Sequence, residues 1–333
     1  MTEPASRPQH VYRWDLDKTY LRTDFDSLRQ LLRTAFESAE NKRAVPGAAQ
    51  LLKELRRRGE TRLSFISGSP RQMRKVLTQK LALDGVEFDE FILKPNLRNL
   101  LTGRFRALRE QVGYKLPALL TGRAGLPVET QETCFGDDAE ADGFIYSLYG
   151  DLLAGRVSAA LLDQILDGAG CYPDDVARTR ALVAALEPAE AVQRIFIHLE
   201  RRSPTARFDR YGARLVPIFN YFQAALVLVE DRQLETAALL RIVHEMTEGF
   251  GYSIDALRNS LQELVRRGRL QHATVERLAA ELALLEGELG RRLGKEVCAL
   301  GGLPLPSTRP ASEPIDYLAA LEVDLPKRKK ARK

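Results

Sequence analysis

Cysteine and long apolar stretches are both scarce in this chain, and the two shortages exclude several classes of protein. The 333 residues include three cysteines, Cys134, Cys171 and Cys298. Because they are odd in number and too far apart for a metal knuckle, we expect reduced thiols and no disulfide framework. The most apolar stretch, residues 215–229, is about 15 residues long, whereas roughly 20 are needed to span a bilayer. We therefore expect a buried core helix there.

The N-terminal residues show no secretory signal, since no basic segment is followed by an apolar one. Together with the reduced cysteines, this predicts a cytoplasmic protein. Peripheral association with a membrane is compatible with that prediction. The chain has 44% hydrophobic and 29% charged residues, a composition typical of soluble globular proteins, and its length is enough for two domains with separate cores.

Positive charge is concentrated at the C-terminus. Residues 327–333 carry six lysines and arginines, so the rest of the chain has a formal net charge of −1, although the total is +5. The basic isoelectric point therefore describes a tail and not a binding face. Such a tail predicts weak contact with an anionic membrane or with nucleic acid, because both present phosphate charge. A solvated run of charge with no dedicated partner is the alternative.

Short apolar segments alternate with helical patterns over the first part of the chain. The strand candidates are residues 11–14, 62–66, 88–93 and 133–135. This alternation predicts an α/β fold, with a Rossmann-like parallel sheet and helices on both of its faces. Functional residues gather at the carboxyl ends of the strands in such a sheet, where Asp15, Ser67, Lys94 and Asp137 all fall.

Beyond about Arg156 the strand signals stop and apolar residues recur at helical spacing. We predict an α/β domain over residues 10–155 and an all-α domain, packed as a bundle, over residues 156–300. Glycine and proline then mark the beginning of a linker and a disordered basic tail over residues 301–333, with one short helix expected at residues 315–321.

Two aspartates lie one residue apart directly after the first strand, in the run Asp15-Leu16-Asp17-Lys18-Thr19. Transfer of a phosphoryl group to a carboxylate needs a nucleophile and a separate proton donor for the leaving oxygen. In this arrangement Asp15 attacks and Asp17 protonates the leaving group and then activates water, while Thr19 stabilises the turn. A solvated acidic turn is the alternative reading of the same residues.

A hydroxyl and an ammonium are the next requirements. Ser67 follows an apolar strand, where its hydroxyl can donate to a transferring phosphoryl oxygen, although a lone serine is also an ordinary turn residue. Two lysines compete to neutralise the anionic charge. Lys94 lies at a strand end, whereas Lys115 opens a predicted helix that leads into the last strand. The order of the elements favours Lys115.

An acidic loop, Gly136-Asp137-Asp138 followed by Asp142, comes after the last of these strands. Mg²⁺ prefers oxygen ligands and usually keeps several waters, so a few carboxylates complete its protein ligands. We predict a Mg²⁺ site whose candidate ligands are Asp15, Asp17, Asp137 and Asp138. Asp137 is the expected direct ligand, and Asp142 is expected as a further ligand or a neighbour of the ligands.

These motifs, in this order within residues 11–150, resemble the phosphatases of the haloacid dehalogenase-like (HAD) superfamily. More narrowly, Ile66-Ser67-Gly68-Ser69-Pro70, Leu93-Lys94, Tyr114-Lys115-Leu116 and Gly136-Asp137-Asp138 resemble the catalytic domain of the actin-patch phosphatidate phosphatase type. That resemblance implies Mg²⁺-dependent hydrolysis of a phosphomonoester, extending to a lipid phosphate such as phosphatidate. That family's acidic loop has Gly-Asp-Ser-Gly-Gln followed by Asp-Pro, a pattern that this chain lacks. The departure weakens the expectation of a lipid substrate more than the expectation of phosphate hydrolysis.

Members of the HAD superfamily often select substrates with inserted cap domains. The chain between Asp17 and Ser67 has room only for a short helical cap near residues 25–39, and the chain between Ser67 and Lys115 has no room for a large one. The site is therefore expected to be open to a large or membrane-bound phosphate. Phosphotransfer to a second sugar hydroxyl, as in mutases, is disfavoured because water is not excluded.

Two functions follow from these residues. The first is a Mg²⁺-dependent phosphomonoester hydrolase that forms an aspartyl-phosphate on Asp15. The alternative is a non-enzymatic helical interaction protein whose HAD-derived domain binds phosphate or serves as a structural module. The presence of both Asp15 and Asp17 argues for the enzyme, because loss of the second carboxylate would remove acid–base catalysis.

Overall fold

The structure is a computed structural model that describes residues 9–22, 43–94, 103–300 and 314–324. The cap predicted near residues 25–39, most of the linker and the basic tail at residues 327–333 lie outside the described residues. None of the described helices is both long enough and apolar enough to cross a membrane.

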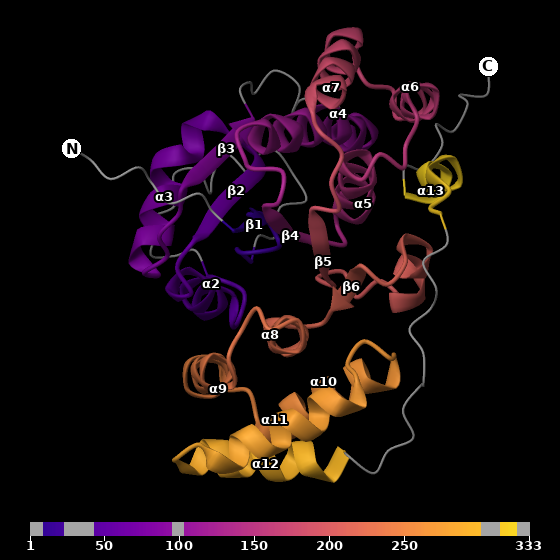
Figure 1. Ribbon diagram of the computed structural model, residues 1–333. Helices are drawn as coiled ribbons and strands as arrows, with labels where there is room; N and C mark the ends of the chain where they lie inside the picture. The colour runs from indigo at the N-terminus through magenta and orange to yellow at the C-terminus, as the bar shows by residue number, and fades with distance from the viewer. Residues whose placement is uncertain (1–8, 23–42, 95–102, 301–313, 325–333) are drawn as a thin grey trace.

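A six-stranded sheet lies at the centre of the molecule, with the strand order β3-β2-β1-β4-β5-β6 (Figure 1). Every neighbouring pair of strands is parallel. The strands are β1 (His10–Asp15), β2 (Thr61–Pro70), β3 (Glu90–Lys94), β4 (Gln131–Asp137), β5 (Val192–His198) and β6 (Leu215–Ile218). The predicted Rossmann-like α/β fold is thus confirmed. The strand order reverses between β1 and β4, and in open parallel sheets ligands bind outside the carboxyl ends of the strands at such a switch.

Helices cover both faces of the sheet (Figure 1). One face carries α2 (Ala48–Arg57), α3 (Arg74–Leu83), α8 (Tyr221–Glu230) and α9 (Thr236–His244), with α10 (Ile254–Arg266), α11 (His272–Leu284) and α12 (Glu288–Leu300) packed outside α8 and α9. The other face carries α4 (Gly103–Ala124), α5 (Asp142–Leu153), α6 (Ala159–Gly168) and α7 (Pro173–Ala185). The short α13 (Tyr317–Asp324) packs against α5 and α6, close to where a short helix was predicted.

Aromatic side chains from the central strands hold α8 against the sheet. The rings of Trp14 in β1 and Phe135 in β4 stack with their centroids 4.0 Å apart, and Phe196 in β5 continues the row at 5.0 Å from Phe135. Tyr221, at the start of α8, stacks on Trp14 at 5.2 Å. Burial of such large rings is a main source of core stability. The packing brings the start of α8 close to the end of β1.

The prediction of an all-α region from residue 156 is wrong for two segments. Strands β5 and β6 lie within that range and extend the same sheet, so the predicted boundary at residue 155 cuts through one sheet. Strands of a parallel sheet are buried on both faces and read as short apolar runs without alternation, which resemble pieces of buried helix. Residues 215–229 likewise form β6 and then α8, not one helix. The helical C-terminal region that begins with α8 is confirmed.

Buried His10 is expected to make the fold less stable in mild acid. The side chain is 6% exposed, and its Nε2 lies 2.9 Å from Thr133 Oγ1. Burial, with a smaller effect of Arg58, lowers the pKa of His10 from 6.5 to about 3. Between these two values the unfolded state binds a proton that the folded state does not, so stability falls as the pH decreases. At pH 5.5 this costs about 1 kcal/mol.

Urea unfolding at pH 7.5 and at pH 5.5 measures this effect. The variant His10→Gln cannot titrate, and its loss of stability between the two pH values should be smaller than that of the wild type by about 1 kcal/mol. An identical pH dependence in the two proteins would contradict the assignment.

Candidate active site

The predicted catalytic residues meet at the carboxyl edge of the three central strands. Asp15 is the last residue of β1 and Asp137 is the last residue of β4, while Ser67 lies near the end of β2. Because β1 pairs with both β2 and β4 in parallel, the ends of the three strands are neighbours. All three side chains are buried.

Lys115 is the cation at the centre of this edge. Its Nζ lies 2.8 Å from Asp15 Oδ1, 2.9 Å from Glu140 Oε2 and 2.5 Å from Asp142 Oδ1. The side chain is fully buried, so an unpaired ammonium here would be very costly and the carboxylates are its compensation. The structure thus brings Lys115 together with Asp15, as the order of the elements favoured.

Lys94, the competing lysine, lies at the end of β3, which is the edge strand and is separated from β1 by β2. Its charge acts on Asp175 in α7. Lys115 itself does not open a helix as predicted but lies within α4, which continues through Pro117. Pro117 lies inside this helix, where proline is tolerated when tertiary packing outweighs the lost hydrogen bond.

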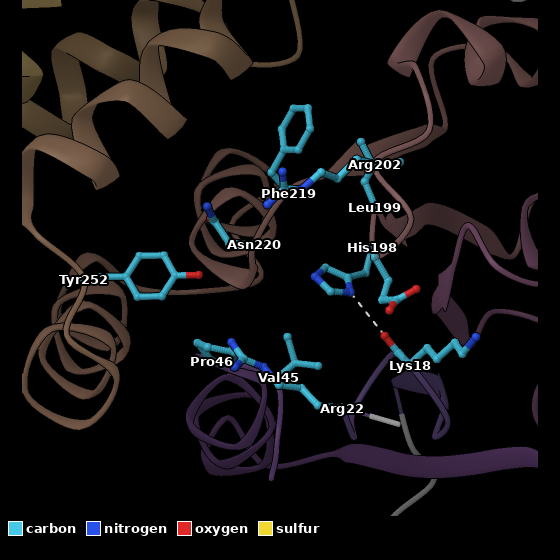
Figure 2. A pocket seen from close by; sticks show the side chains of 11 residues that line it. Lys18, Arg22, Val45, Pro46, His198, Leu199, Arg202, Phe219, Asn220 and Tyr252 are labelled. Atoms are coloured by element: carbon cyan, nitrogen blue, oxygen red, sulfur yellow. Dashed lines mark hydrogen bonds between the residues drawn. The ribbon is translucent and has the colours of Figure 1, made fainter. Parts of the chain in front are cut away.

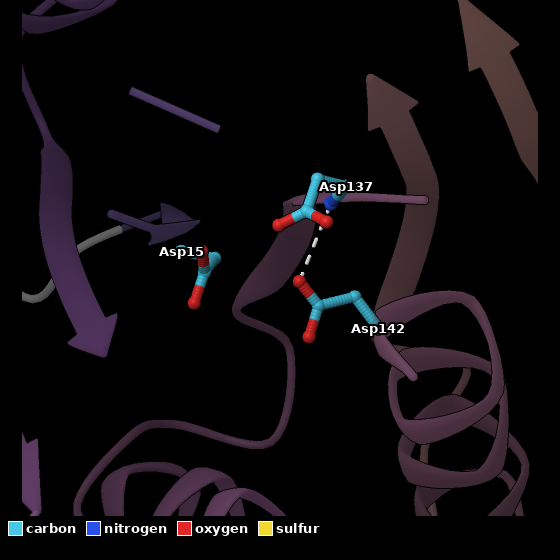
Figure 3. Close-up of side chains that lie close together, drawn as sticks. All are labelled: Asp15, Asp137 and Asp142. Carbon is cyan, nitrogen blue, oxygen red and sulfur yellow. Dashed lines mark hydrogen bonds between the residues drawn. The ribbon is translucent and has the colours of Figure 1, made fainter. Parts of the chain in front are cut away.

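Three carboxylates, those of Asp15, Asp137 and Asp142, form a buried group (Figure 3). Each offers an oxygen within 4.8 Å of the others. Asp142 is the first residue of α5, and its Oδ2 accepts a hydrogen bond of 3.3 Å from the backbone N–H of Asp137. Of the two places predicted for Asp142, a further ligand or a neighbour of the ligands, the geometry favours the first, because its carboxylate lies in the group with Asp15 and Asp137.

The electrostatics of this group favour a further cation. Burial raises the pKa of Asp15 and of Asp137 well above the usual range, neighbouring carboxylates add to the effect, and Lys115 opposes it. Burial likewise raises the pKa of Asp142 to about 6. Asp15 Oδ2 is buried and has no hydrogen-bond partner among the described residues. With Glu140, four carboxylates face one ammonium, and oxygen donors of this kind fit a hard divalent cation such as Mg²⁺.

Asp138 lies next to Asp137 in sequence but is held elsewhere. Its Oδ1 accepts a hydrogen bond of 2.8 Å from the backbone N–H of Arg201, and its Oδ2 accepts one of 2.9 Å from that of Ser203. Consecutive residues of an extended segment point in opposite directions, so only one of the two aspartates can face the carboxylate group. Asp138 instead anchors the loop after β5, and the geometry does not support its prediction as a metal ligand.

Asp17 is held by two serines of β2. Its Oδ2 accepts hydrogen bonds from Ser67 Oγ at 2.9 Å and from Ser69 Oγ at 2.6 Å. Burial raises the pKa of Asp17, while these two hydrogen bonds act in the opposite direction. Asp17 is not one of the three grouped carboxylates, so the geometry does not support its prediction as a metal ligand. Ser69 was missed, although the Ser-Gly-Ser run after the strand carried the signal.

Residues far along the chain hold the turn that carries Asp17. Lys18 has a left-handed backbone with φ of 61°, and His198 Nδ1 lies 3.1 Å from its carbonyl oxygen. Because a carbonyl can only accept, the ring carries its proton on Nδ1 and donates. Tyr221 donates in the same way to the carbonyl of Thr19 at 2.7 Å. The hydroxyl of Thr19 lies 3.4 Å from Asp137 Oδ2, across the site.

Sequence reasoning missed His198 and Tyr221. They lie about 180 and 200 residues after the turn that they contact, and neither is part of a recognisable motif. Only the folding of β5 and α8 beside β1 brings them to it.

Gly136 is required by the close packing of Asp142. A Cβ at this position would lie 2.5 Å from both the Cβ and Oδ2 of Asp142, so Gly136→Ala must displace that carboxylate. Distortion around metal ligands typically costs about 10–100-fold in metal affinity or activity, and we expect a loss in that range. Titration of the melting temperature with Mg²⁺ measures the affinity. Gly125→Ala is the control, because a Cβ there meets no atom of the described residues within 4 Å. Equal Mg²⁺ affinities in the two variants would contradict the role of Asp142.

Comparison with known proteins agrees with the motifs. Residues 14–163 match the family described as phosphatidate phosphatase APP1, catalytic domain, so the resemblance to that type of catalytic domain is confirmed for this part of the chain. The matched segment includes Asp15, Asp17, Lys115, Asp137 and Asp142 but ends before β5. No curated protein and no solved structure matches the chain.

Proposed function

We propose that this chain, whose residues 14–163 are similar to the catalytic domain of a phosphatidate phosphatase, hydrolyses phosphomonoesters with the help of a divalent metal, forming an aspartyl-phosphate on Asp15. The observation that carries the proposal is the buried group of Asp15, Asp137 and Asp142 around Lys115 at the ends of β1 and β4. Four carboxylates with one ammonium have no evident structural purpose, since buried charges of one sign destabilise a fold unless a cation joins them.

Asp15 is the nucleophile in this proposal. Lys115 holds its Oδ1 at 2.8 Å, while Oδ2 has no partner in the part of the chain that the structure describes, so one oxygen is positioned and the other is available for attack. The ammonium of Lys115 favours the ionised carboxylate and lowers repulsion between it and the phosphate. Attack forms a bond between the carboxylate oxygen and phosphorus, and the ester P–O bond breaks.

Asp17 carries the proton. Its raised pKa, caused by burial, favours the protonated form that an acid catalyst needs. Ser67 and Ser69 both bind Oδ2, which leaves Oδ1 to give its proton to the leaving alkoxide. The resulting carboxylate then takes a proton from water, and the hydroxide attacks phosphorus, releases inorganic phosphate and restores Asp15.

Asp15, Asp137 and Asp142 would hold the metal, for which we propose Mg²⁺ because all three offer carboxylate oxygens. A bound Mg²⁺ supplies neutralisation of charge on the phosphoryl oxygens. Thr19 and the backbone N–H groups of Ala139 and Glu140 orient Asp137, the latter two by donating to its Oδ1 at 2.6 and 3.1 Å.

The description of the matched family names phosphatidate, so we propose a lipid phosphate as one substrate of this site. A cytoplasmic protein that meets such a lipid at a membrane surface, with the basic tail as the contact, accords with this proposal.

The test is hydrolysis of p-nitrophenyl phosphate and of short-chain phosphatidate in micelles, with Mg²⁺ and then with EDTA. We expect turnover that EDTA abolishes and added Mg²⁺ restores, because the grouped carboxylates repel the substrate phosphate when no metal joins them. A folded protein whose melting temperature rises with Mg²⁺ but which hydrolyses neither ester would instead favour the non-enzymatic interaction protein.

A further inference from the structure

A cavity of about 430 Å³ opens at the same edge of the sheet as the catalytic residues (Figure 2). Its lining includes Lys18, which directly follows Asp17, His198 at the end of β5, and the two residues that follow β6, Phe219 and Asn220. Cavities of this size bind small molecules or parts of larger ones. Most of the lining comes from residues beyond 163, outside the segment that matches the phosphatase family.

The polar lining of the cavity is arranged for an anion. Arg22 and Arg202 approach from opposite sides in Figure 2, and among the described residues neither takes part in an ion pair. Among the described residues of the lining, Glu200 carries the one carboxylate. Guanidinium groups bind phosphate and carboxylate through paired N–H donors. The cavity therefore presents two arginines against one acid.

Two polar rings face the centre of the cavity. Tyr252 directs its hydroxyl towards the middle, and the ring of His198 faces it from the other side (Figure 2). Phe219, 43% exposed, adds an apolar wall. This mixture of polar and apolar side chains suits a compact anionic group and the short carbon chain that joins it to the rest of a substrate. The cavity is too polar for the acyl chain of a lipid.

We propose that this cavity binds a second anionic group of the substrate, so that the preferred substrates are phosphomonoesters that carry another phosphate or a carboxylate. This inference rests on the proposed phosphatase function. His198 connects the cavity with the catalytic residues. Its side chain lines the cavity and also donates to the carbonyl of Lys18, one residue after Asp17. A ligand in the cavity thus contacts the group that holds the catalytic turn.

The first experiment compares esters that differ only in the second anion: butane-1,4-diol and hexane-1,6-diol bisphosphates against butyl and hexyl phosphate. The wild type should hydrolyse at least one bisphosphate with a kcat/KM about tenfold higher than the matching monophosphate, an effect typical of one charge-assisted contact. Arg202→Gln and Arg22→Gln should remove most of this preference through KM and leave the monophosphates unchanged.

Arg201→Gln is the matched control, because this exposed neighbour does not line the cavity, and it should keep the preference. Equal kcat/KM values for bisphosphates and monophosphates in the wild type, or equal losses on both kinds of ester in the arginine variants, would overturn the proposal.

A binding measurement separates this proposal from the phosphatase function. Calorimetry on Asp15→Asn, which needs no turnover, should show the bisphosphate bound about tenfold more tightly than the monophosphate, with the difference lost when Arg202→Gln is added. If that result is obtained but the wild type hydrolyses no ester, the phosphatase function fails and the anion site stands. If hydrolysis occurs but the bisphosphate has no binding advantage, the anion site fails alone.

Discussion

Asp15→Asn is expected to reduce hydrolysis of phosphate esters by at least about 10³-fold, as losses of a nucleophile typically do. The amide has nearly the shape of the carboxylate and can still accept from Lys115, but it cannot form the bond to phosphorus. Because burial raises the pKa of Asp15, replacing it with a neutral group removes an unfavourable buried charge, and the fold should persist. Steady-state rates and urea unfolding of both proteins provide the measurement.

Two further observations make this test specific. Acid quenching during turnover should trap phosphate on Asp15 of the wild type, detectable by mass spectrometry, and none on the variant. Asp138→Asn is the comparison. Asp138 belongs to the same acidic loop as Asp137, but its carboxylate oxygens accept hydrogen bonds from the loop after β5. We expect this variant to lose less than about tenfold in the rate of hydrolysis. Unchanged turnover in Asp15→Asn would refute the aspartyl-phosphate mechanism.

Lys115→Met should have the largest effect on stability. It leaves Asp15, Asp142 and Glu140 without the ammonium that now contacts all three, and removal of one partner from a buried charge cluster costs about 3–5 kcal/mol. Lys115 opposes the rise in the pKa of Asp15 and Asp142, so without it these carboxyls take up protons more readily in the folded state. The loss should therefore be larger at pH 8 than at pH 5, and urea unfolding in EDTA measures it.

Lys94→Met is the control that decides between the two candidate lysines. Lys94 lies on the edge strand β3 and is half-buried, so we expect a change within about 0.5 kcal/mol and hydrolysis close to that of the wild type. Similar losses of stability and activity in the two variants would contradict the central place of Lys115.

The part of the site that could be predicted consists of residues whose position follows from a strand end. Asp15, Ser67 and Asp137 each close an apolar segment, and parallel strands bring their carboxyl ends to one edge. The alternation of strands and helices predicted that sheet, and the motifs predicted a phosphatase of the kind that the comparison found for residues 14–163. These inferences needed only local spacing and the general geometry of parallel sheets.

The choice between neighbouring candidates was decided by side-chain direction. Asp138 and Asp142 are equally acidic in sequence, but Asp138 turns to the loop after β5 while Asp142, at the start of α5, joins Asp15 and Asp137. Strand position and helix rotation set these directions, and both depend on how α5 packs on the sheet. The choice between Lys115 and Lys94 was decided in the same way. The packing of α4 over the central strands places Lys115, and not Lys94, beside Asp15.

Local sequence was sufficient to determine the α/β class, the strand ends and the position of Asp15 and Asp17 directly after a strand, because these depend on residues close together in the chain. Tertiary structure alone decided the two added strands, the three grouped carboxylates, and the contacts of His198 and Tyr221 with the catalytic turn. The physical reason is that burial on both faces removes the alternation that marks a strand. Contacts across about 200 residues also leave no periodic pattern in the chain.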